Sequence, residues 1–134
     1  MNKQSNFATH ILSPISLGEL LDKITILEIK KEHMTNQKLE NVNKEHKFLQ
    51  NVLNDQNLEI DLNLVQSLKE INLRLWGIED EIRIKERNQE FDSEFIELAR
   101  SVYKVNDKRA EIKRKINEKY NSELVEEKQY NESI

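Results

Sequence analysis

Polar side chains that could bind a ligand lie on the arcs of two predicted helices that should face the protein interior. At about 100° per residue, the polar residues of the first helix share an arc with Leu75 and Ile82. Those of the second helix continue the arc of Phe95 and Val102. A buried charge without a partner costs several kcal/mol or more, so these groups either satisfy one another across helices or line a cleft. They are Asn72, Glu79, Arg83 and Glu86 in the first helix and Asn106, Arg109 and Lys113 in the second.

One group of these residues suggests a metal site. Folding the predicted helices about their loops brings Glu28, Glu79 and Glu86 to one end of a bundle, with Arg83 nearby. Carboxylate oxygens are the ligands that Mg²⁺ prefers, and Mg²⁺ usually also recruits a substrate phosphate. The three carboxylates are therefore a candidate metal site, and Mg²⁺ is the cofactor that would suit them. Interhelical ion pairs, such as Glu86 with Arg83, are the simpler explanation of the same residues.

A second group suggests an anion site. The other end of the bundle gathers amide and basic side chains, and Arg and Lys beside amides suit a phosphate or a carboxylate. An aromatic residue at the edge of the apolar arc, Trp76, could stack on a ligand, although such residues more often close a core. A polar network that only fixes the register of the helices would contain the same residues. The candidate ligand-binding residues are Asn72, Trp76, Arg83, Asn106, Arg109 and Lys113.

The elements that would position these side chains are long helices. Charged residues make up 34% and hydrophobic residues 37% of the 134 residues, and the chain has 2 Gly and 1 Pro, which leaves little material for turns. Ser16 followed by Glu19 forms a capping box that starts the first helix. Short loops make neighbouring helices antiparallel. We therefore expect an all-α, coiled-coil-like, antiparallel up-down-up bundle of three long helices.

The whole chain, 1–134, is expected to form one helical domain. A break near Thr35-Asn36 would divide the first helix, because neither residue is a strong helix former. The predicted helices cover 17–53, 62–87 and 93–120, between an irregular N-terminal arm, 1–13, and an acidic C-terminal tail, 121–134.

Composition argues against several classes of function. The net charge of −4 disfavours a nucleic-acid-binding protein that relies on bulk attraction. No apolar run approaches the roughly 20 residues of a membrane helix, and residues 1–12 lack the apolar core of a signal peptide. We expect a cytoplasmic protein that does not associate with membranes. The sequence contains no P-loop, no dinucleotide fingerprint and no Ser-His-Asp arrangement.

Several stretches together resemble a known family. They are Ser13-Pro-Ile-Ser-Leu-Gly-Glu-Leu-Leu-Asp-Lys-Ile-Thr-Ile-Leu-Glu-Ile-Lys30, Leu75-Trp-Gly-Ile-Glu-Asp-Glu-Ile-Arg83, Phe95-Ile-Glu-Leu-Ala-Arg-Ser-Val-Tyr103, Asn106-Asp-Lys-Arg-Ala110 and Glu126-Glu-Lys-Gln-Tyr130. The chain from Ser13 to Tyr130 resembles a bacterial family described as a domain of unknown function. The resemblance implies no activity; it implies an origin in bacteria or bacterial viruses and a genomic neighbourhood with glycosyltransferases.

Two functions from different classes remain open. The first is a non-catalytic helical module that assembles with itself or with a protein partner. Helices too long for a small globule and apolar residues off the main arc, such as Ile29, Leu73 and Ile84, favour it. The alternative is a small-molecule site or a metal-assisted enzyme in the polar interior. Phosphate suits its bases, and the resemblance adds nucleotide sugars as candidate ligands.

Overall fold

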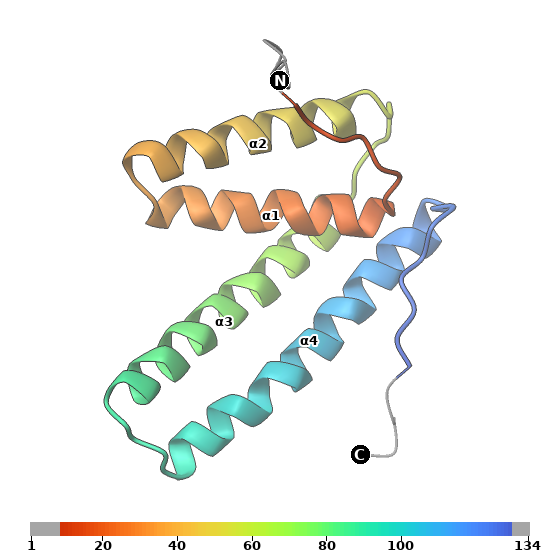
Figure 1. The fold of residues 1–134 in the computed structure, drawn as a ribbon. Helices are drawn as coiled ribbons and strands as arrows, with labels where there is room; N and C mark the ends of the chain where they lie inside the picture. Colours follow the sequence, from red (N-terminus) through yellow and green to blue (C-terminus); the bar gives the residue numbers. More distant parts are fainter. Residues whose placement is uncertain (1–8, 130–134) are drawn as a thin grey trace, which may run out of the picture.

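The computed structural model describes residues 9–129, and those residues form helices and loops without any strand. The helices of this region are α1 (Leu17–His33), α2 (Asn36–Asn54), α3 (Leu62–Arg87) and α4 (Ser93–Lys119). Figure 1 shows two antiparallel hairpins, α1 with α2 and α3 with α4, joined where α1 crosses the second hairpin. The all-α prediction is confirmed. The predicted arm and tail lie partly outside the described residues.

The expected bundle of three helices is wrong, because the chain breaks between α1 and α2. Met34 and Thr35 adopt extended backbone, with φ of −112° and −135°, and the φ of Asn36 is +54°. Asn tolerates this left-handed conformation better than most residues, so the chain can reverse here. The break falls at the predicted weak point. The bounds of α3 are as predicted, and α4 ends at Lys119, with Tyr120 as its C-cap.

Helix α1 is the central element of the fold. It packs against α2 on one side and against α3 and α4 on the other, whereas α2 does not contact α3 or α4. A helix covered on two sides cannot keep a wide polar face, and eight of the 17 residues of α1 are buried as a result. Its buried residues are Gly18, Leu20, Leu21, Asp22, Ile24, Thr25, Leu27 and Ile29.

The densest apolar packing lies where α1, α3 and α4 meet. Leu21, Leu68 and Ile116 are buried against one another there. Half-buried apolar residues from all four helices and the loop before α3 surround this core, namely Leu17, Leu53, Ile60, Leu64, Val65, Ile112 and Tyr120.

The opposite end of the second hairpin is much less covered. Figure 1 shows the ends of α3 and α4 that adjoin their connecting loop projecting away from α1 and α2. No residue of the stretch 79–104 is fully buried. We call this stretch the distal hairpin.

Candidate functional site

Asp22 lies at the centre of the polar interior. Its side chain, in the second turn of α1, has no exposed surface. The carboxylate oxygen Oδ1 accepts hydrogen bonds from Asn72 Nδ2 and from Arg109 Nε, both at 2.9 Å. Arg109 Nη2 donates to the second oxygen, so the guanidinium binds the carboxylate in a bidentate manner. The hydrogen bonds to Asp22 hold the pKa of Arg109 above its ordinary value.

Three further residues complete this arrangement, and with Asp22 and Arg109 they form what we call the Asp22 cluster. Thr25 Oγ1 donates to the carbonyl oxygen of Asp22 at 2.8 Å and accepts from Asn72 Nδ2 at 3.0 Å. Asn106 Oδ1 accepts from Arg109 Nη1 at 3.4 Å. No buried side-chain polar atom among residues 9–129 lacks a partner. The cluster therefore satisfies itself and fixes α1 against α3 and α4.

A second group of charges lies beside the cluster, around Lys113 of α4. The side chain of Lys113 is only 9% exposed, and its Nζ donates to Glu19 Oε2 and to Glu126 Oε2, both at 2.7 Å. Burial lowers the pKa of Lys113, but its hydrogen bonds to Glu126 and Glu19 outweigh that effect and raise it. The hydrogen bond from Lys113 in turn lowers the pKa of Glu126.

The first turn of α1 is pressed directly against α4 at this point. The backbone N–H of Gly18 donates to Asn117 Oδ1 at 2.7 Å, and that of Leu17 donates to Ser122 Oγ at 3.2 Å. A Cβ atom on Gly18 would lie 2.6 Å from the carbonyl oxygen of Lys113. The N-terminal N–H groups of a helix usually need side-chain or solvent partners, and here other parts of the chain supply them.

The structure brings together four of the six residues predicted to bind a ligand. Asn72, Asn106 and Arg109 belong to the Asp22 cluster, and Lys113 lies beside it. The anions that Asn72, Arg109 and Lys113 contact are carboxylates of the chain itself. The remaining two, Trp76 and Arg83, lie elsewhere.

Trp76 and Arg83 are not part of this group. The ring of Trp76 stacks on His33 at the end of α1, with 4.7 Å between the ring centroids and 15° between the planes. The side chain of Arg83 is 75% exposed, and its nearest carboxylate is Glu79, at 4.0 Å. Stacking on His33 assigns Trp76 to the packing between α1 and α3.

The three carboxylates predicted to bind a metal are not brought together. Glu28 accepts a hydrogen bond from Lys69 at 3.2 Å, whereas Glu79 and Glu86 are exposed. Within residues 9–129, no three Asp, Glu, His or Cys side chains are grouped so that they could hold a metal ion. The prediction that the three carboxylates lie at one end of the bundle assumed that the first helix is continuous over 17–53. Because α1 instead ends at His33, opposite Trp76, it leaves the next two turns of α3 uncovered.

Asp22, Thr25, Glu19 and Glu126 contribute to the site but were not among the predicted site residues. Because α1 is covered on two sides, it has no single apolar face on which a buried polar residue would stand out in the sequence. The signals are that Asp22 and Thr25 stand one turn apart among apolar residues, and that both lie in the stretch 13–30 that carries the family resemblance. Nothing in the local sequence around Glu126 indicates that it contacts Lys113.

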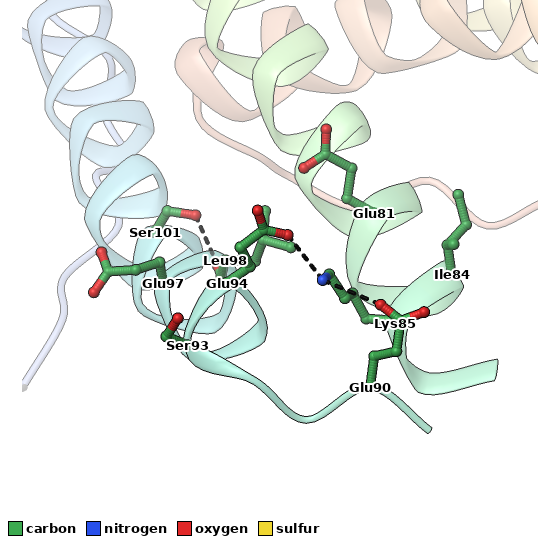
Figure 2. A pocket seen from close by; sticks show the side chains of 9 residues that line it. All are labelled: Glu81, Ile84, Lys85, Glu90, Ser93, Glu94, Glu97, Leu98 and Ser101. Carbon is green, nitrogen blue, oxygen red and sulfur yellow. Dashed lines mark hydrogen bonds and ion pairs between the residues drawn. The ribbon is translucent and has the colours of Figure 1, made fainter. Parts of the chain in front are cut away.

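A separate hollow lies between α3 and α4 near their loop, on the distal hairpin (Figure 2). Its one base, Lys85, contacts Glu94, Asp92 and Glu90 at 2.8, 2.9 and 3.3 Å. Hydrogen bonds to Glu94 and Asp92 hold the pKa of Lys85 above its ordinary value. Lys85 is thus already engaged in holding the loop to both helices. The lining residues are Glu81, Ile84, Lys85, Glu90, Ser93, Glu94, Glu97, Leu98 and Ser101.

The chain belongs to a family described only as a family of unknown function, DUF6165, whose model matches residues 11–134. No curated protein and no solved structure matches the chain. Among the described residues, no helix has both the length and the apolar character needed to span a membrane. The family resemblance is therefore confirmed, whereas the expected links with bacteria, bacterial viruses and glycosyltransferases stay predictions.

Proposed function

We propose that this chain is a non-catalytic helical module that assembles with a second copy of itself through the distal hairpin. The observation that carries the proposal is that no residue of 79–104 is fully buried, although the stretch is almost entirely helical. Most of the stability of a protein helix comes from packing its apolar face, and two helices cover each other on one side only. A further pair of helices would complete a four-helix arrangement.

The apolar residues of the distal hairpin support this proposal. Ile82 of α3 and Leu98 and Val102 of α4 are half-buried between the two helices. Two other apolar residues of α4, Ile96 and Tyr103, are 54% and 46% exposed. Exposed apolar side chains commonly mark interaction sites. A partner that covers Ile96 and Tyr103 would also bury the partly exposed apolar residues between α3 and α4.

Charge on the same hairpin favours a second copy as the partner. Glu79 and Arg83 lie about two helical turns beyond Asn72 and Trp76, so they continue the side of α3 that faces α1. They carry opposite charges one turn apart. In a two-fold dimer each surface contacts its own copy, so Glu79 of each protomer can face Arg83 of the other.

The polar interior does not require catalysis to account for it. Every buried side-chain polar atom of residues 9–129 has a hydrogen-bond partner. Arg109 is engaged by Asp22, and Lys113 by Glu19 and Glu126. The cluster is therefore suited to fixing the position of α1 on the second hairpin, from which the distal hairpin extends.

The test is the mass of the full chain in solution, measured by sedimentation equilibrium over a range of concentrations. The wild-type chain should form a dimer that dissociates on dilution. Tyr103→Glu should be monomeric with an unchanged monomer melting temperature, whereas Lys104→Gln, at the neighbouring exposed position, should still dimerise. A wild-type monomer at several hundred micromolar would overturn the proposal.

A charge exchange tests the two-fold arrangement itself. Arg83→Glu should weaken the dimer, because it places like charges opposite each other. Adding Glu79→Arg to the same chain should restore the dimer. Failure of this restoration in a chain that still dimerises would exclude the proposed register.

A further inference from the structure

We propose that Lys113 and Arg114 form an anion site that the C-terminal segment of the chain, residues 122–129, occupies in the absence of a ligand. An exogenous phosphate or carboxylate group would compete with the side chains of Glu126 and Glu127 for these two bases. This inference does not depend on the proposed dimer, because the site lies near the C-terminal end of α4, far along that helix from the distal hairpin.

Asp22 and Glu126, two of the three carboxylates that contact Arg109 and Lys113, differ in how they are held. Asp22 belongs to helix α1, has no exposed surface, and its carboxylate accepts hydrogen bonds from two residues. Glu126 belongs to a segment without helix or strand that runs back along α4, and its side chain is 43% exposed. Asp22 is a permanent part of the fold, whereas Glu126 is placed where another anion could replace it.

The pairing of the segment with α4 involves two consecutive acids and two consecutive bases. Glu126 contacts Lys113 and Glu127 contacts Arg114, each at 2.7 Å. The side chain of Lys113 is largely buried, and displacing the segment would leave it with Glu19 as the one carboxylate that it contacts. A phosphate group offers two negative charges and several acceptor oxygens, so it can substitute for both carboxylates.

The segment acts as a tethered competitor. It is attached to α4 close to the site, because the backbone N–H of Ser122 donates to the carbonyl oxygen of Asn117 at 2.8 Å. Groups joined by a short flexible linker have effective concentrations of the order of millimolar. Free anions should therefore bind the wild-type chain weakly, and removing the two acids should strengthen their binding by about tenfold or more.

The experiment titrates the full chain with inorganic phosphate and, separately, with acetate, at constant ionic strength set by chloride. Amide chemical shifts measured by NMR report both the bases and the segment. In the wild-type chain, the anion should move the amide signals of 122–129 toward random-coil positions. In the double variant Glu126→Gln/Glu127→Gln, binding should be at least about tenfold tighter, because the competitor is gone.

Two variants link the binding to the bases. Adding Lys113→Met to the double variant should abolish binding, and adding Arg114→Gln, at the more exposed base, should weaken it. The second variant keeps the test valid if Lys113→Met fails to fold. Phosphate binding without acetate binding, or the reverse, would support the site and identify its ligand class. Equal affinities in all variants, or no binding of either anion to the double variant, would overturn the proposal.

Discussion

At Gly18, the absence of a side chain is what lets the first turn of α1 touch α4. A Cβ there would lie 2.6 Å from a backbone oxygen and 3.0 Å from Asn117 Oδ1, and the backbone cannot move without shifting α4. Gly18→Ala should therefore lower the free energy of unfolding by about 1–3 kcal/mol, as overpacked sites do. Urea denaturation measures the effect.

Gly77 provides the matched control for that substitution. A Cβ at Gly77 would meet no atom within 4 Å. Gly77→Ala should raise the free energy of unfolding by up to about 1 kcal/mol, because alanine is the better helix former. Effects of the same sign at the two glycines would contradict the close contact at Gly18.

Asp22 is the residue on which the buried polar interactions converge. Asp22→Asn removes the charge that faces Arg109 and should lower the free energy of unfolding by about 3 kcal/mol, because breaking a buried pair leaves an uncompensated charge. The control is Glu97→Gln, which breaks the exposed pair with Arg100, 3.4 Å away, and should change the free energy by less than about 1 kcal/mol. Comparable losses in the two variants, measured by denaturant unfolding, would count against a structural cluster.

The individual residues of this site were only partly predictable from the sequence. Asn72, Asn106 and Arg109 were identifiable because α3 and α4 each have one apolar arc, on which a polar residue stands out. Asp22 was not, because α1 is covered on two sides and has no single apolar arc. The contact of Glu126 with Lys113 could not be found from the sequence, since it joins an irregular segment to a turn of α4 that lies 13 residues earlier.

At the scale of the helices, the residue that follows the C-cap of α3 has a backbone conformation better suited to glycine. Gln89 has a φ of +56°, and the N–H of Glu90 donates to the carbonyl oxygen of Lys85 at 2.9 Å, as in a Schellman motif. Gln89→Gly should raise the free energy of unfolding by roughly 1 kcal/mol, the cost that the left-handed conformation imposes on other residues. Thermal unfolding with a van't Hoff analysis can detect a change of this size.

A second glycine substitution checks the cause of that gain. Gln66→Gly, at an exposed helical position of α3, should lower the free energy of unfolding by about 1 kcal/mol. If both substitutions destabilised the protein, the left-handed conformation of Gln89 would not be the source of strain.

The number of helices was predicted wrongly because the spacing of the apolar residues does not reveal the break between α1 and α2. Leu39, Val42 and Leu49 continue the apolar spacing of Leu17 and Leu21, so the arc passes through the break without interruption. The reversal at 34–36 depends on the backbone conformation of a few residues. Once α1 ends there, Glu28 lies opposite Lys69 instead of Glu86, which separates the carboxylates of the predicted metal site.

At the scale of the whole molecule, docking of the C-terminal segment should depend on pH. The pKa of Glu126 in the folded protein lies below its ordinary value of 4.5, chiefly because Lys113 donates to it. Its contribution is therefore complete above that ordinary value and is lost as the pH falls through the lowered pKa. Other charged groups near this contact are Glu19, Arg109 and Lys128, and the pair that Glu127 forms with Arg114.

NMR spectra of the full chain between pH 7 and pH 3 should show residues 122–129 leaving α4 below about pH 4.5. In the double variant Glu126→Gln/Glu127→Gln the same signals should be largely insensitive to pH, because both carboxylates that contact α4 are absent. An identical pH dependence in the two chains would assign the release to another group.

The distribution of burial predicts how the molecule opens. Residues Leu20–Ile29 of α1 are covered by three helices, whereas the stretch 79–104 has no fully buried residue. Amide hydrogen exchange should therefore be slower in Leu20–Ile29 of α1 than in the distal hairpin, since local opening follows the density of buried contacts. Binding of a second copy stabilises only the surface that it covers, so raising the protein concentration should slow exchange in 79–104 and leave α1 unchanged. Tyr103→Glu should remove that concentration dependence, and a slowing that is uniform along the chain would place the contact between copies elsewhere.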